Sequence, residues 1–388
     1  MSPPVPVPHR LHMPTTQIGS PHEITASKAN DYLERAHDLA AEKLQAYAGY
    51  PELQAEILAE AVTDVRFSDD VDQAAVRIAD CISLTELYQY KGLTIKNEAK
   101  QPTQAYKIRG AANFILKNVL EAGYKRVVTA SAGNHGQAVA LVASRFGIAA
   151  TIVLPRGAPK VKIEAIRAFG GTVYFYGEDY GESSQKAYEL NEQQGGVYVP
   201  AFNHYDIMAG QGTVAKEIFD QYPAIQNMVV PVGGGGLLAG CARYSAIRDP
   251  SVKVYGAGIA GGSAGETAFQ SGNRGRTIPN KFADGIAVQQ LGDLTWPEIK
   301  RHARGVLTAD ELSVRRTIGL LSLQGHTLEG AGAVGIAAAL KQRALLGKNT
   351  VVIATGGNID HDVLASCRQL VSGKLSEPLT KVPEFSTI

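Results

Sequence analysis

Four consecutive glycines, Gly233 to Gly236, follow the apolar run 228–232 and precede Leu237 and further residues typical of an apolar helix. Because these glycines have no side chains, their backbone N–H groups can close around an anion, and the start of a helix adds partial positive charge. A flexible linker is the alternative, but a linker is not normally framed by a buried strand and a helix. The loop therefore predicts a phosphate site, although it matches neither the P-loop nor the Gly-x-Gly-x-x-Gly pattern.

A second cluster of small and polar residues, Ser131-Ala132-Gly133-Asn134-His135, follows the apolar run 127–130. Ser131 and the backbone N–H groups after it can hold a carboxylate, and Asn134 can hydrogen-bond an oxygen on a ligand ring. Taken alone, the cluster also fits an ordinary capped helix. A single histidine such as His135 is more often structural than catalytic.

One lysine and one threonine complete the set of candidate residues. Lys107 lies in a segment of mixed polarity, 101–113, and by itself it fits a solvated helix lysine. Thr355 follows the apolar run 351–354 and precedes two glycines and Asn358, which repeats the pattern of a buried strand that ends in small residues.

Short β-branched runs alternate with longer helical stretches through most of the chain, and they predict strands near 126–129, 150–154, 172–176, 197–199, 228–232, 252–255 and 350–354. Runs that are apolar throughout suit strands buried on both faces, and intervening helices imply parallel sheets. In such sheets ligands bind beyond the carboxyl ends of strands. The glycine loop, the Ser131 cluster and Thr355 all follow strand ends, so an α/β fold is expected to gather them.

The first residues differ from the rest. Residues 1 to about 24 are rich in proline and lack the apolar core of a secretory signal. Ser27 offers a helix N-cap, Gly49 can end that helix, and Pro51 can begin a second one. A third short helix is expected over Val71–Ala79.

Composition excludes several classes of function. The chain has 388 residues, a net charge of +1, 45% hydrophobic and 19% charged residues, and no run long and apolar enough to span a membrane. No basic stripe is present, so neither nucleic acid nor a membrane surface is an expected partner. Three widely spaced cysteines favour a reduced, cytoplasmic setting rather than a disulfide scaffold.

The motifs occur in a specific order, and together they resemble the fold-type II pyridoxal-phosphate (PLP) enzymes, in the threonine dehydratase and serine racemase branch. The ordered motifs are Lys107-Ile-Arg-Gly-Ala, Ser131-Ala-Gly-Asn134-His135-Gly-Gln, Ala209-Gly-Gln-Gly-Thr, Gly233 to Gly236, Ala283-Asp-Gly, Glu329-Gly-Ala-Gly-Ala and Thr355-Gly-Gly-Asn. Any one of them is weak, but the whole set over residues 70 to 365 is specific. The resemblance implies two open, twisted, mainly parallel sheets flanked by helices, as in the tryptophan synthase β fold.

The resemblance also implies roles for residues. Lys107 would carry PLP as a Schiff base and move protons at the substrate Cα, and Asn134 would bond the ring hydroxyl. The phosphate would lie in the loop of Gly233, Gly234, Gly235, Gly236 and Leu237. Ser131 and the backbone of Ala132, Gly133 and His135 would take the substrate carboxylate. Thr355 would meet the pyridine nitrogen, and as a neutral partner it would leave that nitrogen unprotonated, which favours β-elimination over transamination.

The expected organisation is an arm and helical extension over 1–65, a large PLP-binding domain from 66–125 and 204–388, and a small domain over 126–203 that closes on substrate. A symmetric homodimer is the default expectation. The expected activity is that of an ammonia-lyase, which converts a serine- or threonine-like L-amino acid into a 2-oxo acid and ammonia.

Several positions depart from the family pattern. Gln104-Ala105-Tyr106 stands where the family usually has Gly-Ser-Phe, and Ala132 replaces the second serine of serine racemase, so racemisation lacks its second base. The stretch from Gly256 to Ser263 lacks the glutamate of the family's divalent-cation site, so no metal is predicted. Two alternatives therefore stay open. One is a diverged PLP enzyme that eliminates or replaces another β- or γ-group or cyclises a modified amino acid, and the other is a PLP-binding protein without catalysis.

Overall fold

The computed structural model describes residues 26–375, which fall into two compact units with the boundary between Val62 and Thr63. The first unit contains α1 (Ala26–Ala46) and the start of α2 (Pro51–Arg77), and Gln54 of α2 donates a 2.9 Å hydrogen bond to the carbonyl of Leu44. No helix in the described part of the chain is long and apolar enough to cross a membrane.

The observed length of α2 differs from the prediction. A separate helix was expected over Val71–Ala79, but α2 runs without interruption from Pro51 to Arg77. The physical reason lies in the sequence, because neither glycine nor proline occurs between Glu52 and Arg77 to end the helix. Pro51 does begin the helix, as predicted.

The larger sheet of the second unit has six strands in the order β1-β2-β10-β7-β8-β9. Its strands are β1 (Leu87–Tyr90), β2 (Leu93–Asn97), β7 (Asn227–Pro231), β8 (Lys253–Ile259), β9 (Val306–Ala309) and β10 (Thr350–Ala354). Only β1 and β2 pair antiparallel, and the other pairs are parallel. The strands β1, β2 and β9 were not expected from the sequence.

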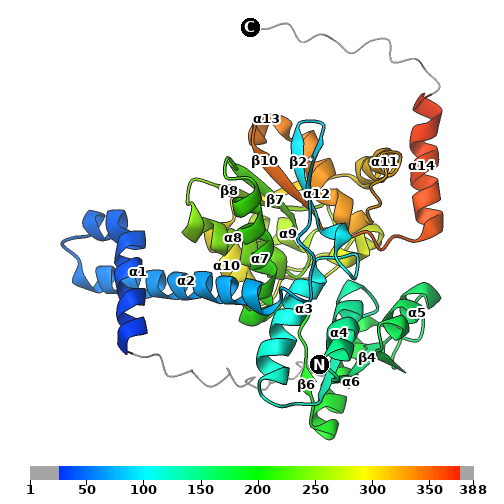
Figure 1. Cartoon of the computed structure of the whole chain (residues 1–388). Helices are drawn as coiled ribbons and strands as arrows, with labels where there is room; N and C mark the ends of the chain where they lie inside the picture. The colour runs from blue at the N-terminus through cyan, green and yellow to red at the C-terminus, as the bar shows by residue number, and fades with distance from the viewer. Residues whose placement is uncertain (1–25, 376–388) are drawn as a thin grey trace, which may run out of the picture. The chain divides into compact units, whose positions relative to one another are not determined.

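The smaller sheet has four parallel strands in the order β5-β4-β3-β6. These are β3 (Arg126–Ala130), β4 (Ala149–Leu154), β5 (Thr172–Phe175) and β6 (Val197–Tyr198), and they match four predicted strands. The helices α4 (Asn134–Arg145), α5 (Lys160–Ala168) and α6 (Tyr180–Gln194) connect them, and Figure 1 shows this group apart from the larger sheet. The predicted α/β fold with two parallel-rich sheets is thereby confirmed.

The remaining helices lie outside the connections of the smaller sheet. They are α3 (Lys107–Ile115), α7 (Tyr205–Gln221), α8 (Gly236–Arg248), α9 (Ala264–Ser271), α10 (Thr295–His302), α11 (Glu311–Ser322), α12 (Gly330–Lys341), α13 (Arg343–Leu346) and α14 (His361–Leu375). One of them, α3, packs its buried side chains against α4 and the smaller sheet. Short turns cover Glu98–Lys100 and Lys281–Ile286, and a π-helical turn at Leu116–Leu120 extends α3.

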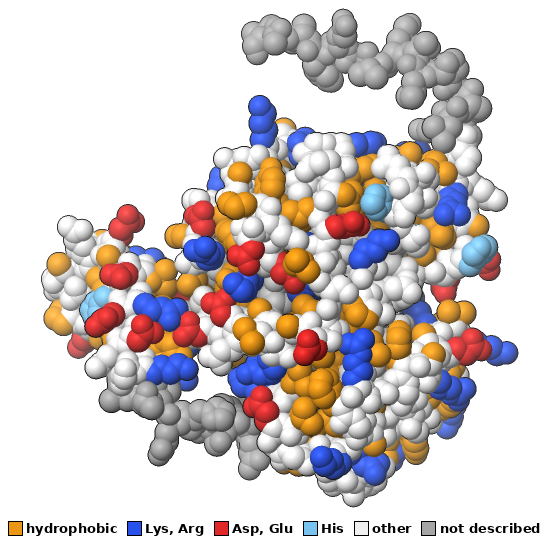
Figure 2. All heavy atoms as spheres, in the orientation of Figure 1, with side chains coloured by type: hydrophobic (Ala, Val, Ile, Leu, Met, Phe, Trp, Pro, Cys, Tyr) orange, Lys and Arg blue, Asp and Glu red, His pale blue; other side chains and the backbone are white. Residues whose placement is uncertain are grey.

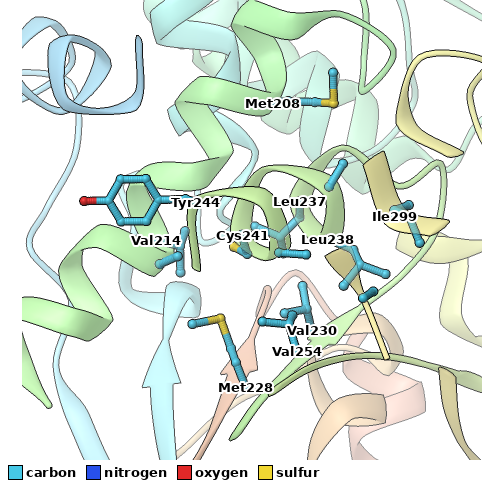
Figure 3. Packing of buried hydrophobic residues seen from close by; sticks show 14 of the residues in the cluster. Met208, Val214, Met228, Val230, Leu237, Leu238, Cys241, Tyr244, Val254 and Ile299 are labelled. Carbon is cyan, nitrogen blue, oxygen red and sulfur yellow. The ribbon is translucent and has the colours of Figure 1, made fainter. Parts of the chain in front are cut away.

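A buried apolar cluster fixes the start of α8 over the larger sheet. Figure 3 shows Leu237, Leu238 and Cys241 of α8 beside side chains of the sheet, among them Val230 of β7 and Val254 of β8. Burial of this cluster stabilises the fold through the hydrophobic effect and close packing. Because Leu237 and Leu238 follow the glycine loop directly, the same packing holds that loop at the end of β7.

Charges on the surface are mixed in sign. Figure 2 shows acidic and basic side chains interspersed on the visible face. The formal net charge of +1 agrees with this balance.

Candidate active site

Lys107 is the first residue of α3, and its amine points to a chain segment that links the two sheets. Its Nζ donates a 2.9 Å hydrogen bond to the carbonyl of Ala201, and it lies 5.4 Å from the ring centroid of Tyr106. Burial without a carboxylate partner lowers the pKa of Lys107 to about 8. About a tenth of this amine is therefore unprotonated at pH 7, far more than for an ordinary lysine, and a nucleophilic lysine requires the unprotonated form.

The residues before Lys107 are pinned to the loop after β10. The backbone N–H of Tyr106 donates to the carbonyl of Thr355 at 3.0 Å, and that of Gly357 donates to the carbonyl of Gln104 at 2.9 Å. Gln104 has a φ of +54°, in the left-handed region that favours glycine. The glutamine that replaces the family's usual glycine therefore keeps a backbone conformation that suits the glycine better.

A buried network of charges lies behind the start of α3. Arg109 contacts both Glu98 oxygens, at 2.7 and 2.8 Å, and both Glu217 oxygens, at 2.7 and 2.8 Å. Lys96 adds a 2.6 Å bond to Glu217. The two cations and two carboxylates balance, so none of these buried charges is unpaired. The carboxylates hold the pKa of Arg109 above its ordinary value.

The glycine loop lies between β7 and α8, where packing leaves no room for side chains. A Cβ at Gly233 would lie 2.9 Å from Ile286, and one at Gly236 would lie 2.9 Å from the carbonyl of Phe202. Gly235 has a φ of +99°, and its neighbour Gly234 accepts a 2.7 Å hydrogen bond from the buried hydroxyl of Thr295. The loop is thus a fixed turn rather than a flexible linker.

The Ser131 cluster follows β3 and opens α4. The Oγ of Ser131 accepts a 3.2 Å hydrogen bond from the backbone N–H of Gly133, and its own hydrogen is left for a ligand. His135 is buried, with its Nε2 3.1 Å from the carbonyl of Val199. Burial, together with the nearby charge of Lys107, lowers the pKa of His135 to about 3, so its imidazole is neutral.

Asn134 connects this cluster to the larger sheet. Its Nδ2 donates to Glu329 at 2.8 Å, and its Oδ1 accepts from Asn358 at 2.8 Å. Burial and the nearby Asp284 raise the pKa of Glu329 to about 8. The hydroxyl of Thr355 is buried and donates to the carbonyl of Ala331 at 3.0 Å.

These contacts bring the motifs of the sequence into one region. The segment 199–202 meets His135 through Val199, Lys107 through Ala201 and the glycine loop through Phe202. The loop 355–358 meets the residues before Lys107 on one side and Asn134 on the other. The candidate residues therefore border a common site although they are far apart in the chain.

Glu329, Asn358 and Phe202 border the site, although the sequence did not predict a role for them. Glu329 and Asn358 did lie inside motifs, and their polar side chains beside small residues could have indicated that they belong to the site. Phe202 carried no signal, because only the tertiary structure places it against the glycine loop.

The site fits a phosphate-bearing aldehyde cofactor on observations of the structure itself. Lys107 offers a partly buried amine whose pKa is lowered to about 8. The glycine loop presents bare backbone at the start of α8, where a phosphate is favoured. Asn134 and Thr355 add neutral polar groups, so no buried carboxylate charge opposes an anionic cofactor from these positions.

Comparison with known proteins decides the family. A family model described as "Pyridoxal-phosphate dependent enzyme" matches residues 74–356. The chain belongs to this family of pyridoxal-phosphate-dependent enzymes. The match begins within α2 and extends to the loop after β10, so it includes every candidate residue of the site.

Individual relatives give the branch of this PLP enzyme. An L-threonine ammonia-lyase of Thermotoga maritima is 40% identical over 273 residues, which cover 70% of this chain and 68% of that protein. An L-threo-3-hydroxyaspartate ammonia-lyase of Saccharomyces cerevisiae is 32% identical and covers 80% and 97%. The solved structure of maize serine racemase is 30% identical, with a TM-score of 0.72, and covers 80% and 98%. The enzyme is thus a PLP-dependent lyase of the threonine dehydratase type.

No group of three or more histidine, cysteine, aspartate or glutamate residues that could hold a metal ion occurs among residues 26–375. At Gly258, in the stretch where the family has its metal glutamate, an added Cβ would lie 2.5 Å from the Cβ of Ser263. The side chain of Ser263 therefore fills the space where a carboxylate stem would need to pass.

Proposed function

We propose that this enzyme acts on a serine- or threonine-like L-amino acid and converts it into a 2-oxo acid and ammonia. The observation that carries the proposal is the Lys107 amine, whose lowered pKa and bond to Ala201 suit proton transfer beside the glycine loop. The relatives support the reaction class, and their names include threonine and 3-hydroxyaspartate as substrates. Both are β-hydroxy amino acids.

Lys107 is assigned the proton transfers. PLP, when bound, supplies the electron sink that makes the substrate Cα acidic. The Nζ of Lys107 takes the proton from Cα and delivers it to the β-hydroxyl, which leaves as water. The released enamine gains a proton at Cβ to become an imine, and addition of one water then gives the 2-oxo acid and ammonia, so one water is lost and one is consumed.

The start of α4 is assigned to the substrate carboxylate. Ser131 keeps a free hydroxyl hydrogen, and the backbone N–H groups of Ala132, Gly133 and His135 lie at or before a helix N-terminus. To bind the carboxylate, the N–H of Gly133 must release Ser131, to which it now donates. This end of a helix favours a negative charge. The neutral His135 is a structural support for the turn in this scheme, since its ring is bonded to Val199.

The remaining residues are assigned to the cofactor. Gly233, Gly234, Gly235, Gly236 and the N–H of Leu237 would hold its phosphate. Asn134 would donate to its ring oxygen, and Thr355 would meet its pyridine nitrogen. To donate to that nitrogen, the Thr355 hydroxyl must release the carbonyl of Ala331, to which it now donates.

We further propose that residues 126–203 form a small domain that closes on the substrate, against a large domain of 66–125 and 204–388. Support comes from the ion pair between Lys162 of α5 and Asp284 of the 281–286 turn. This pair links the part of the chain that carries the smaller sheet to the part that carries the larger sheet. Closure of this kind would exclude water from the site.

Two further properties, the oligomeric state and the cellular location, complete the proposal. A homodimer is proposed on the general preference of soluble enzymes for two-fold symmetry. A cytoplasmic location is proposed because Cys81, Cys241 and Cys367 are all unpaired and buried. Light scattering of the purified protein and fractionation of cells test these two points.

A different reaction on the same cofactor is the second candidate. The observation that favours it is Tyr106, a half-buried phenol beside Lys107 that stays protonated because desolvation raises its pKa. Such a hydroxyl can donate to a leaving group other than water. Replacement at a β- or γ-position, or cyclisation, would then retain the nitrogen, whereas elimination of a group other than hydroxyl would still release ammonia.

The deciding experiment is a visible absorption spectrum of the native protein and of Lys107→Ala while L-amino acids are added. We expect a Schiff-base band in the native protein only, and a 2-oxo acid with ammonia from a β-hydroxy amino acid. A product that keeps its nitrogen would favour the second candidate. A band that amino acids shift without any product would indicate binding alone, and no band after incubation with PLP would overturn the proposal.

A further inference from the structure

The side-chain amide of Asn134 is held at both ends. Its Nδ2 donates to Oε1 of Glu329 at 2.8 Å, and its Oδ1 accepts from Nδ2 of Asn358 at 2.8 Å. Asn134 opens α4 beside the smaller sheet, whereas both partners belong to elements of the larger sheet. The amide therefore lies where the two parts of the site meet.

Asn358 determines which way this amide points. Its Nδ2 also donates to the backbone carbonyl of Thr103 at 2.9 Å, and a carbonyl can only accept. The nitrogen of Asn358 must therefore face both Thr103 and Asn134, so the atom of Asn134 that it meets must be the oxygen. The Asn134 nitrogen is then turned to Glu329, and the direction of the chain of bonds is unambiguous.

Glu329 is buried, and the backbone around it is shaped to accommodate its side chain. Its backbone N–H donates to the carbonyl of Gly356 at 3.0 Å, and only 5% of its surface is accessible. A Cβ at Gly356 would lie 2.5 Å from its Oε1, and a Cβ at Gly285 would lie 3.4 Å away. Two glycines thus make room for this one carboxyl group.

The protonation state of Glu329 suits a neighbour of an anionic ring oxygen. Desolvation and Asp284 raise its pKa to about 8, so the carboxyl is mainly neutral at pH 7. A neutral carboxyl still accepts the hydrogen bond from Asn134 at Oε1. It does so without adding a negative charge to the site, where that charge would oppose an anionic cofactor.

We propose that Glu329 is a positioning residue that holds the Asn134 amide with its nitrogen toward the cofactor ring, and that Asn358 completes this orientation. The inference rests on the proposed contact between Asn134 and the ring oxygen. An amide nitrogen carries two hydrogens, of which one bonds Glu329 and the second stays available for that oxygen. Without Glu329 the amide can turn, and the ring oxygen loses its fixed donor.

The test compares Glu329→Gln with the nearly isosteric, apolar Glu329→Met in the full-length protein. The readouts are the position of the visible band of bound PLP and the Kd for PLP of the apoprotein. Glu329→Gln should keep the band and hold Kd within about twofold, because its amide oxygen accepts the same bond. Glu329→Met should move the band and raise Kd roughly tenfold.

Two further variants keep the test decisive even if Glu329→Met does not fold. Asn358→Leu should move the band in the same direction, although it leaves the carboxyl intact. In an Asn134→Ala background, loss of Glu329 should change neither band nor Kd any further, because its partner is already absent.

The outcomes separate this inference from the proposed function. A native band that Lys107→Ala removes establishes the cofactor site. If that band and the Kd then stay unchanged in Glu329→Met or in Asn358→Leu, the positioning role is overturned alone. Additive changes in the Asn134→Ala background would overturn it as well, since Glu329 would then act independently of Asn134.

Discussion

The Nζ of Lys107 donates a 2.9 Å hydrogen bond to the backbone carbonyl of Ala201, 94 residues along the chain. Ala201 lies just after the smaller sheet and before α7, next to the Phe202 that contacts the glycine loop. The amine is thereby aimed at the point where the chain passes between the two sheets. A neutral acceptor, rather than a carboxylate, leaves burial free to lower the pKa of the lysine.

The first prediction concerns the reaction of the apoprotein with PLP. The pKa of Lys107 is lowered to about 8, and only the unprotonated amine attacks an aldehyde. The rate of band formation should therefore rise about tenfold per pH unit below pH 8 and level off above it. Stopped-flow absorbance measures this rate. A rate that keeps rising up to pH 10 would show an ordinary lysine.

The second prediction concerns stability and pH. Glu329 has a folded-state pKa raised to about 8, so between its ordinary value and pH 8 the folded protein binds more protons than the unfolded chain. Stability from this group is full below the ordinary pKa and falls as the pH rises, at up to about 1.4 kcal/mol per pH unit. In Glu329→Gln this loss of stability with rising pH is absent, because glutamine does not titrate. The Tm of Glu329→Gln relative to the native protein should thus increase from pH 5 to pH 8, and a constant difference would contradict the raised pKa.

The third prediction concerns backbone strain before Lys107. Gln104 has a φ of +54°, which costs a residue with a Cβ about 1–2 kcal/mol. Gln104→Gly should raise the free energy of unfolding by up to about 1 kcal/mol, because the relief of strain exceeds the entropy that glycine adds to the unfolded chain. Gln104→Ala keeps the Cβ and should give no gain. Equal stability of the two variants in urea would show that this backbone is not strained.

The fourth prediction concerns the charge network behind α3. Arg109→Met leaves Glu98 and Glu217 buried without their main cation, which should cost about 3–5 kcal/mol of stability. Arg156→Met is the matched control, because its partner Glu178 is exposed and the pair is worth at most about 1 kcal/mol. Chemical denaturation measures both. A small effect at Arg109 would mean that water enters the network.

The fifth prediction concerns the glycine loop. Gly235→Ala places a Cβ 2.7 Å from both Ile299 and Thr295 at a φ of +99°, so the loop must shift. The affinity for PLP should fall at least about tenfold, which corresponds to the loss of one or two hydrogen bonds to the phosphate. Gly157→Ala, where no atom lies within 4 Å of the added Cβ, should leave affinity unchanged. Titration of the apoprotein with PLP decides the matter.

Much of the fold could be predicted from the sequence because the patterns that indicate strands and helix ends are local. Apolar runs gave seven strands, from β3 to β8 and β10, and glycine and proline marked the ends of helices such as α1 and the start of α2. The strands β1, β2 and β9 were missed for a physical reason. In β2, for example, Lys96 and Asn97 are buried polar residues, and partners outside the strand, among them Glu217 and Glu86, make that burial tolerable.

The ordered motifs around Lys107, Asn134, the glycine loop and Thr355 determined by themselves the family of this protein and the type of its cofactor. Each motif is a short run whose backbone chemistry acts locally. Only the tertiary structure determined the orientation and the protonation state of these groups. Asn134 and Glu329 are 195 residues apart, and Asn134 and Asn358 are 224 apart, yet their contacts fix the direction of an amide. The lowered pKa of Lys107 and the raised pKa of Glu329 arise from desolvation, which depends on every segment that packs over a group and so is not written in the residues beside it.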